Sequence, residues 1–282
     1  MILFPNAKIN LGLRVLGRRS DGYHDLSTVM VPVGWCDVLE LVPAPQGQGT
    51  SLTVMDDNVD CPPEKNLVMK AFAAMETALG RELPPTAIYL KKLIPDQAGM
   101  GGGSADAAFT LKGLNDLYEL DLDDESLARI AAGIGADCPF FITNRPALCT
   151  GIGTVETTDI TVNCAGMSLL IAKPLDASVS TAQAYAGMEC CGYDVESPAQ
   201  ITARPVAEWR DRLINDFEPG VFRLCPSVAA LKQQMYAAGA VYASMTGSGA
   251  AVYGLYESDI LAHRAAGALA ACVSKVLPMT LG

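Results

Sequence analysis

The chain has 282 residues, of which 50% are hydrophobic and 18% are charged, and its formal net charge is −11 at pH 7. This composition is typical of a globular protein with room for two domains, and it excludes an intrinsically disordered chain. The acidic balance argues against nucleic acids and anionic membranes as partners. Nine scattered cysteines without a CxxC pair, beside only two histidines, favour free thiols over a zinc site.

The longest apolar stretches, Met167–Ala172 and Ala265–Val273, are far shorter than a membrane-spanning helix. The N-terminal sequence MILFPNAKINLG carries no basic region followed by an apolar run and a cleavage site. We therefore expect a cytoplasmic protein of bacterial type, with neither a signal nor a transit peptide and no membrane partner.

The first predicted element is a strand over Ala7–Val15, where polar and apolar residues alternate strictly. Ile9 and Leu11 belong to its apolar face. Because strand side chains alternate with a period of two, Lys8 and Asn10 project side by side from the other face. The strand is expected to be half buried, with these two side chains on its polar face, away from the core.

The rest of the chain mixes strands and helices. In the first half we predict strands over Ser27–Val33, Asp37–Val42, Ser51–Met55 and Ala87–Leu93, helices over Asn66–Leu79, Ser104–Tyr118 and Asp124–Gly133, and a short apolar strand after the turn at Gly135–Pro139. In the second half we predict a strand over Ser168–Ala172, helices over Ser180–Met188, Val206–Ile214 and Ser227–Ala238, a hairpin of Ala240–Met245 and Ala250–Tyr256, a helix from Ser258 and a strand over Val273–Leu277.

This order of elements lacks a regular βαβ alternation and therefore predicts an α+β fold rather than a doubly wound sheet. The pattern changes near residue 150. We therefore expect an N-terminal domain over residues 1–150 and a C-terminal domain over residues 151–282.

A glycine-rich loop, AGMGGGS at Ala98–Ser104, joins a predicted strand to a predicted helix. Glycines let the backbone approach a ligand closely, and the N-terminus of a helix directs unpaired N–H groups at an anion. The loop has no GxxxxGK[ST] pattern and opens no βαβ unit, so it is neither a P-loop nor a dinucleotide fingerprint. The alternative interpretation is a surface loop in which Ser104 is an ordinary N-cap.

Five segments together carry a family resemblance: PNAKINLGL at 5–13, DGYH at 21–24, AGMGGGSADAA at 98–108, GADCPFF at 135–141 and TGSGAAVYG at 246–254. In this order, over the whole chain, they resemble the GHMP kinase superfamily and, within it, the 4-diphosphocytidyl-2-C-methyl-D-erythritol kinase family. The resemblance implies a two-domain fold of mixed and antiparallel sheets with helices packed on one side. It also implies transfer of the γ-phosphoryl group of ATP to the 2-hydroxyl of a cytidine-diphosphate alcohol in the non-mevalonate isoprenoid pathway.

The resemblance also assigns roles to residues. It implies that Asp137 accepts the proton of the substrate hydroxyl, and that Lys8 holds Asp137 and offsets charge on the transferred phosphoryl group. ATP would be bound by Asn66 and Lys92 near the nucleoside and, around the phosphates, by Ala98, Gly99, Met100, Gly101, Gly102, Gly103 and Ser104. The cytidine-diphosphate side of the acceptor would be bound by Asn10, Tyr23, His24, Thr181 and Tyr185, with the Tyr185 ring stacked on the cytosine.

The glycine loop departs from the family pattern at one position. The family usually has a second serine after the glycine run, where this chain has Ala105. Mg²⁺ is therefore expected with the nucleotide, but no metal ligand is predicted in the protein. Asp106 is interpreted as a complement to the helix dipole in the first helical turn, and a direct role in holding Mg²⁺ is the less favoured alternative. Valine at Gly102 is expected to weaken ATP binding with little loss of fold stability, because its side chain blocks the approach of the backbone to phosphate.

Two alternatives remain open at the level of the sequence. One is a GHMP kinase that acts on homoserine, mevalonate or a sugar, which the DGYH and AKINL segments disfavour. The other is a catalytically silent binding protein on the same fold, since a fold does not determine a function. The presence of both Lys8 and Asp137 disfavours this second alternative.

Overall fold

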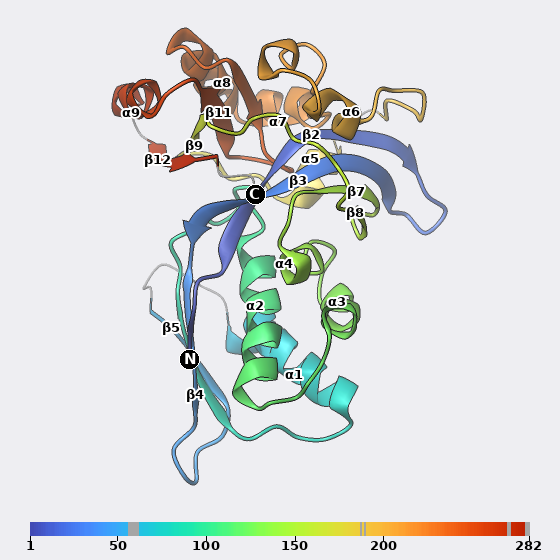
Figure 1. The fold of residues 1–282 in the computed structure, drawn as a ribbon, viewed down its shortest axis with the longest axis vertical. Coiled ribbons are helices and arrows are strands. Elements are labelled where there is room, and N and C mark those ends of the chain that lie inside the picture. Colours follow the sequence, from blue (N-terminus) through green and yellow to red (C-terminus); the bar gives the residue numbers. More distant parts are fainter. Residues whose placement is uncertain (56–61, 187, 189, 270–271, 280–282) are drawn as a thin grey trace. The chain divides into compact units, whose positions relative to one another are not determined.

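The computed structural model describes residues 1–55, 62–186, 188, 190–269 and 272–279 (Figure 1). Cys61 lies outside these residues, and the eight cysteines within them are all free thiols. No helix among the described residues has both the length and the apolar character needed to span a bilayer.

The chain forms two compact units whose segments alternate along the sequence. Unit 1 consists of Met1–Ala7, Gly34–Ile94 and Gly101–Arg145, and unit 2 of Lys8–Val33, Pro95–Met100 and Pro146–Gly282. The chain passes from unit 1 to unit 2 for the last time after Arg145, close to the predicted boundary at residue 150. Because it also passes between the units earlier, dividing the sequence at this one position does not separate them.

Unit 1 is built on a four-stranded sheet in the order β1-β4-β6-β5, in which β5 runs parallel to β6 and the other pairs are antiparallel. Its strands are β1 (Ile2–Leu3), β4 (Val38–Pro43), β5 (Ser51–Val54) and β6 (Thr86–Lys91). Its helices are α1 (Leu67–Leu79), α2 (Gly102–Leu117), α3 (Asp124–Ala132), α4 (Phe140–Thr143) and the 3₁₀ turn η1 (Pro63–Lys65). The α-helices lie on one face of the sheet, as Figure 1 shows.

Two helices of unit 1 show how the sequence defines this layer. Asn66 caps α1 by accepting a hydrogen bond from the Val68 N–H, and Gly80 ends the helix in the left-handed conformation at φ +62°, as predicted. Helix α2 approaches the sheet closely at Gly113, where a Cβ would lie 2.5 Å from Leu41 Cδ1 and 2.6 Å from Leu3 Cδ1. Glycine at this position therefore sets the distance between α2 and the sheet.

Unit 2 holds two four-stranded sheets, β2-β3-β7-β8 and β10-β11-β9-β12. The strands are β2 (Asn6–Arg18), β3 (His24–Cys36), β7 (Ala147–Gly151), β8 (Val155–Thr157), β9 (Ser168–Pro174), β10 (Tyr242–Met245), β11 (Val252–Tyr256) and β12 (Cys272–Pro278); the ends of β2 and β3 extend into unit 1. The helices are α5 (Thr181–Ala186), α6 (Pro198–Thr202), η2 (Val206–Glu208), α7 (Glu218–Leu224), α8 (Pro226–Ala237) and α9 (Asp259–Ala268).

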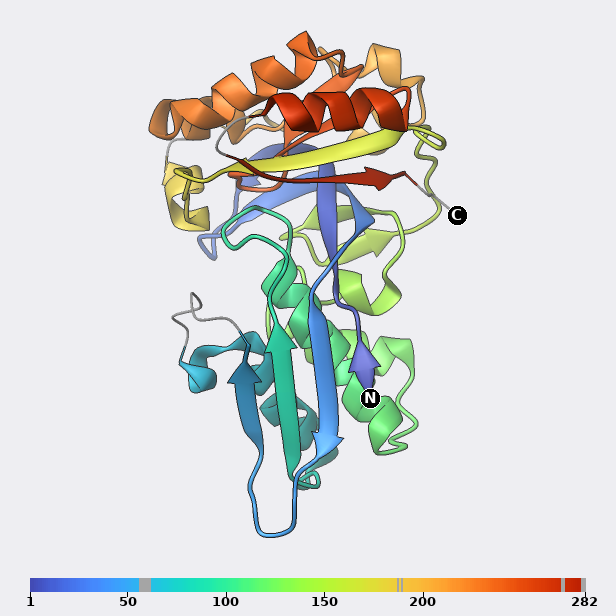
Figure 2. The ribbon, with the colours of Figure 1, turned by 90° about the vertical axis from the view of Figure 1, so that its left-hand side faces the viewer.

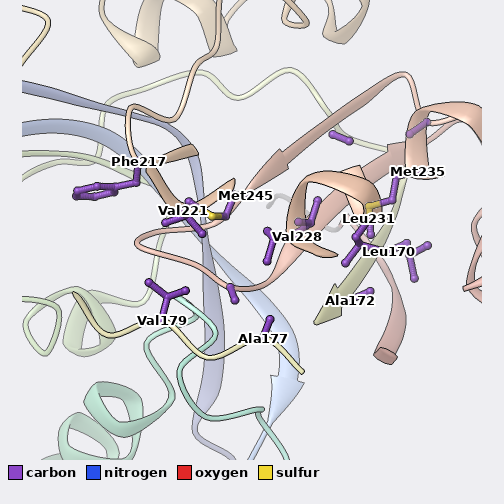
Figure 3. Close-up of a cluster of buried hydrophobic side chains, with 14 of the residues drawn as sticks. Leu170, Ala172, Ala177, Val179, Phe217, Val221, Val228, Leu231, Met235 and Met245 are labelled. Carbon is purple, nitrogen blue, oxygen red and sulfur yellow. The ribbon is translucent and has the colours of Figure 1, made fainter. Parts of the chain in front are cut away.

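Helices α8 and α9 cover one face of the β10-β11-β9-β12 sheet (Figure 2). Buried side chains from α7, α8 and this sheet, among them Val221, Leu231, Leu170 and Met245, form the core of unit 2 (Figure 3). The predicted hairpin is confirmed, with β10 and β11 antiparallel and Met245 paired with Val252. Burial of these apolar surfaces supplies most of the stability of the unit.

Three expectations about local structure are wrong. The apolar run after the GADCP turn is not a strand but one helical turn, α4, which ends where Asn144 adopts φ +51° and donates its backbone N–H to the Phe140 carbonyl. The helix expected over Val206–Ile214 is only the 3₁₀ turn η2. Beyond it the chain turns over residues 210–213 and then pairs with β2 at a single bridge, where Leu13 exchanges backbone hydrogen bonds with Ile214 and Asp216.

The third error concerns the face of β2 that carries Lys8 and Asn10. These side chains are only 3% and 2% exposed, so both faces of the strand are buried. Short apolar and polar alternation does not distinguish a solvated face from one that a polar network covers. In unit 2 the covering groups are Thr28, Thr246 and Gly99.

Candidate active site

Lys8 lies at the centre of a buried polar network in unit 2. Its ammonium donates hydrogen bonds to Asn10 Oδ1 and to the Gly99 carbonyl at 3.0 Å, and its backbone N–H donates to the Met100 carbonyl at 3.0 Å. Asn10 Nδ2 in turn donates to Thr28 Oγ1 at 3.0 Å. The structure therefore brings Lys8, Asn10 and the first half of the glycine loop together, with a cation in a fixed position.

The loop Thr246–Gly249, between β10 and β11, is the other wall of this network. The Asn10 N–H donates to Thr246 Oγ1 at 3.0 Å, and a Cβ on Gly99 would lie 2.0 Å from the Thr246 carbonyl oxygen. Gly99 has φ +70° and so occupies a conformation that favours glycine. The backbone N–H groups of Ala250 and Ala251 donate to the carbonyls of Gln97 and Ala98, which pins the loop to residues 97–99.

Asn215 holds the Thr246–Gly249 loop in place through side-chain hydrogen bonds. Nothing in the sequence indicated that this residue contributes to the site. Its Nδ2 donates to the carbonyls of Met245 at 2.8 Å and Gly247 at 2.9 Å, and its Oδ1 accepts from the Phe217 N–H at 3.0 Å. Three residues along, Glu218 accepts from Ser244 and from the Met245 N–H. Asparagine after a predicted helix carries no signal of such a role, because the contacts are made across 30 positions or more.

The second half of the glycine loop opens α2 in unit 1. Gly101 is the residue before the helix, at φ +71°, so the helix begins two residues earlier than predicted. A Cβ on Gly103 would lie 3.5 Å from Leu67 Cδ1, which places the start of α2 beside the start of α1 and its cap Asn66. Ser104 hydrogen-bonds the Cys138 thiol, whose pKa burial raises to about 11. Asp137, the residue before Cys138, thus lies in a turn next to the N-terminus of α2.

The side chain of Lys92 reaches the N-terminus of α2 as well. A Cβ on Gly102 would lie 3.4 Å from Lys92 Nζ and 3.2 Å from Ile94 Cγ2. The position is therefore tightly packed, so a larger side chain there requires Ile94 or Lys92 to shift, and the small loss of fold stability expected for valine at Gly102 stays a prediction. The interpretation of Asp106 is wrong: it lies beyond the first turn of α2, is 3% exposed and pairs with Lys92 at 2.6 Å.

The residues predicted to bind the cytidine-diphosphate side of the acceptor, apart from Asn10, line one cavity of about 320 Å³ in unit 2. It is lined by Gly22, Tyr23, His24, Ile152, Thr181, Ala182 and Tyr185. The rings of His24 and Tyr185 stack with centroids 4.8 Å apart and planes at 23°, and Phe217 meets Tyr185 edge-on at 4.8 Å. The volume lies at the lower end of the range for small-molecule sites.

The cavity is connected to the Lys8 network through the Thr246–Gly249 loop. Thr181 Oγ1 lies 3.4 Å from Ser248 Oγ, two residues from Thr246. Within unit 2, Thr181 of the cavity and the predicted catalytic Lys8 are therefore both connected to the segment that carries the Thr246–Gly249 loop. Asp137, Asn66 and Lys92 belong to unit 1, so the pairing of Asp137 with Lys8 stays a prediction.

Comparisons with known protein families and relatives identify the family of this chain. Residues 66–145 match the GHMP kinases N terminal domain, and residues 203–275 match the GHMP kinases C terminal family. A relative from Porphyromonas gingivalis named 4-diphosphocytidyl-2-C-methyl-D-erythritol kinase is 44% identical over 94% of this chain and 96% of its own length. The chain belongs to the 4-diphosphocytidyl-2-C-methyl-D-erythritol kinase family of GHMP kinases.

Solved structures support the same family. A crystal structure of a 4-(cytidine 5'-diphospho)-2C-methyl-D-erythritol kinase is 31% identical to this kinase, with a TM-score of 0.79 over 99% of this chain and 100% of its own. A homoserine kinase from Cytophaga hutchinsonii matches with a TM-score of 0.71 over 96% of this chain and 93% of its own. At 18% identity this second likeness shows the fold alone. The α+β fold with GHMP domains in both halves of the chain is confirmed.

Proposed function

We propose that this kinase transfers the γ-phosphoryl group of ATP to the 2-hydroxyl of 4-(cytidine 5'-diphospho)-2-C-methyl-D-erythritol, in the non-mevalonate route to isoprenoid precursors. The observation that carries this proposal is the 44% identity, over nearly the whole chain, to a relative named for this activity. The cavity lined by Tyr23, His24 and Tyr185 supports it, because aromatic faces suit a nucleobase.

Membership of the GHMP kinases implies ATP as the co-substrate. We infer that the polyphosphate binds along the glycine loop, where N–H groups at the start of α2 and the ammonium groups of Lys8 and Lys92 offset its charge. Within the described ranges no three His, Cys, Asp or Glu side chains cluster as a metal site. These residues fit a Mg²⁺ ion that arrives with the nucleotide and keeps phosphate and water ligands, and they do not fit a protein cage.

Phosphoryl transfer passes through a loose transition state, so positioning and charge stabilisation dominate the catalysis. The Lys8 ammonium, fixed by Asn10 and the Gly99 carbonyl, would offset charge on the transferred group. Asp137 would accept the proton of the substrate hydroxyl. Early proton removal contributes little in such a transition state, so a weakly basic carboxylate suffices.

A steady-state assay of ADP release tests the proposal with the purified protein and three acceptors: the cytidine-diphosphate methylerythritol, mevalonate and homoserine. We expect turnover with the first acceptor and none above background with the other two. The Asp137→Asn variant serves as the control that the activity belongs to this site. Equal turnover of homoserine would overturn the acceptor and leave the family intact, and no ADP release with any acceptor would overturn the activity.

A further inference from the structure

A buried cluster of three charged side chains, which we call the Lys92 triad, lies in unit 1. Lys92, which follows β6, donates to the carboxylates of Asp37, between β3 and β4, and of Asp106, in α2. Asp37 has no exposed surface, and Asp106 is 3% exposed. Two buried carboxylates around one ammonium carry a formal net charge of −1, which is costly in a poorly solvated environment.

The two carboxylates are not equivalent. Asp37 is fully hydrogen-bonded, because its Oδ1 accepts from the backbone N–H groups of Leu93 at 2.5 Å and Ile94 at 2.8 Å. Asp106 Oδ2 pairs with Lys92, but Asp106 Oδ1 is a buried oxygen without a partner among the described residues. Protonation of a carboxylate whose buried oxygen has no hydrogen-bond donor lowers the free-energy cost of its burial.

The surroundings of Asp106 favour that proton. Burial raises the pKa of Asp106 to about 7, against the opposing effect of Lys92, and the nearby Asp37 carboxylate raises it further. Burial alone would lower the pKa of the Lys92 ammonium. The attraction of the Asp106 and Asp37 carboxylates is larger than this effect of burial, so the pKa of Lys92 is raised. Near neutral pH the ammonium therefore stays charged, while the Asp106 carboxyl is divided between its two forms.

The charged side chains on the other elements packed against α2 are exposed or have partners other than Asp106. Glu40 belongs to the face of β4 opposite to the buried Leu39 and Leu41. The remaining charged groups on α1, α2 and α3 are exposed or bonded elsewhere: Lys70, Asp116, Asp124, Glu125 and Arg129 are exposed, Glu76 accepts from the Leu83 N–H, and Lys112 donates to the Ile142 carbonyl. The Cys138 thiol near Ser104, with a pKa raised to about 11, is neutral in this range.

The triad lies against the glycine loop, since a Cβ on Gly102 would reach within 3.4 Å of Lys92 Nζ. Resting on the proposed function, which puts the nucleotide at this loop, we propose that Asp37 and Asp106 hold Lys92 as a prepositioned cation for the nucleotide, and that Asp106 takes up a proton when the nucleotide binds. Asp106 and Asp37 are positioning residues in this proposal, and Lys92 is the group that meets the ligand.

The direction of proton flow follows from the charges. A bound polyanion disfavours the ionised form of Asp106, and it competes with Asp106 for the Lys92 ammonium, which acts in the same direction. From a starting pKa of about 7, a rise of about one unit takes the carboxyl from roughly one quarter protonated to roughly three quarters at pH 7.5, an uptake of about half a proton per nucleotide.

Isothermal titration calorimetry with ADP at pH 7.5, in phosphate and in Tris buffer, measures this uptake directly, because the two buffers differ in ionisation enthalpy. The wild-type protein should take up about half a proton more than the Asp106→Asn variant, which keeps the shape of the side chain and cannot titrate. The matched control is Asp116→Asn, at an exposed position on the same helix, which should behave as the wild type. Any proton exchange by the phosphates of ADP itself is common to all three proteins.

The outcomes separate the two proposals. ADP binding with equal proton uptake in wild type and Asp106→Asn overturns the role of Asp106 and leaves the kinase activity untouched. No ADP binding by the wild type overturns the nucleotide site itself. If the variant does not fold, the wild type alone decides: its uptake should pass through a maximum near pH 7.5, and a value that only falls from pH 6 to pH 9 overturns the proposal.

Discussion

Replacing Gly99 by alanine should destabilise unit 2 substantially. The new Cβ would lie 2.0 Å from the Thr246 carbonyl oxygen and 3.0 Å from the Gly249 nitrogen, both of them backbone atoms that cannot rotate away. Gly99 also has φ +70°, a conformation that costs an alanine about 1–2 kcal/mol. Overpacking of a well-packed site adds about 1–3 kcal/mol. The free energy of unfolding should therefore fall by roughly 2–5 kcal/mol, a large fraction of the stability of an ordinary domain.

The glycine loop offers its own control at Gly103. This residue lies in α2, is exposed, and has room for a Cβ at 3.5 Å from Leu67 Cδ1. Alanine at Gly103 should leave stability unchanged or raise it by about 0.5–1 kcal/mol, because glycine is a poor helix former. Of two glycines four positions apart in one motif, only Gly99 should therefore lose stability on substitution by alanine.

Urea denaturation followed by tryptophan fluorescence measures both effects. The chain has two tryptophans, Trp35 in unit 1 and Trp209 in unit 2, so single-tryptophan backgrounds report each unit separately. Gly99→Ala should lower the midpoint reported by Trp209. A loss below about 1 kcal/mol, or equal changes in the two alanine variants, would refute the steric reasoning.

Three further predictions concern activity. Tyr185→Ala should raise the KM of the acceptor by roughly one to two orders of magnitude and leave the KM of ATP unchanged, since base stacking is worth ~1–3 kcal/mol; equal changes in both values would contradict stacking. Asn215→Ala should cost about 1–3 kcal/mol in urea denaturation, because two buried carbonyls lose their donor, and should raise the KM of ATP, while an unchanged KM would mean that the Thr246–Gly249 loop is irrelevant to the nucleotide. Lys8→Ala and Asp137→Asn should each lower kcat by orders of magnitude and the double variant by little more, whereas multiplicative losses would indicate that the two residues act independently.

The sequence predicted most elements whose signals are local. The helix predicted over Asn66–Leu79 has helical spacing and a glycine after it, and the structure has a helix over Leu67–Leu79 that Gly80 ends. The hairpin around Thr246–Gly249 has apolar runs on both sides of a glycine turn, and its strands pair as expected. Where one short segment carries all of the information, pattern is enough.

The failures occur where contacts over long distances in the chain decide the structure. A helix was expected over Val206–Ile214, but the chain forms a 3₁₀ turn and further turns there, and Leu13 of β2 then pairs with Ile214 and Asp216. The burial of Lys8 depends on Thr246 and Gly99, which lie far along the chain. Asp106 has the sequence context of a dipole complement, and only the fold reveals Asp37 and Lys92 beside it. Propensity is overridden in each case by tertiary contacts.

The net charge of this kinase raises the question of how it would hold polyanions, and each unit has one lysine beside its own part of the glycine loop, Lys8 at Gly99 and Lys92 at Gly102. A chain with a formal charge of −11 must hold polyanions through local positive potential. The Lys8 ammonium donates hydrogen bonds to Asn10 Oδ1 and to the Gly99 carbonyl, which help to set its position. Lys92 is held by two carboxylates, so the potential that it offers depends on whether Asp106 carries a proton. Under the proposed function, Lys8 would offset charge on the transferred group, whereas the charge of the Lys92 triad would adjust to the nucleotide through the uptake of about half a proton by Asp106.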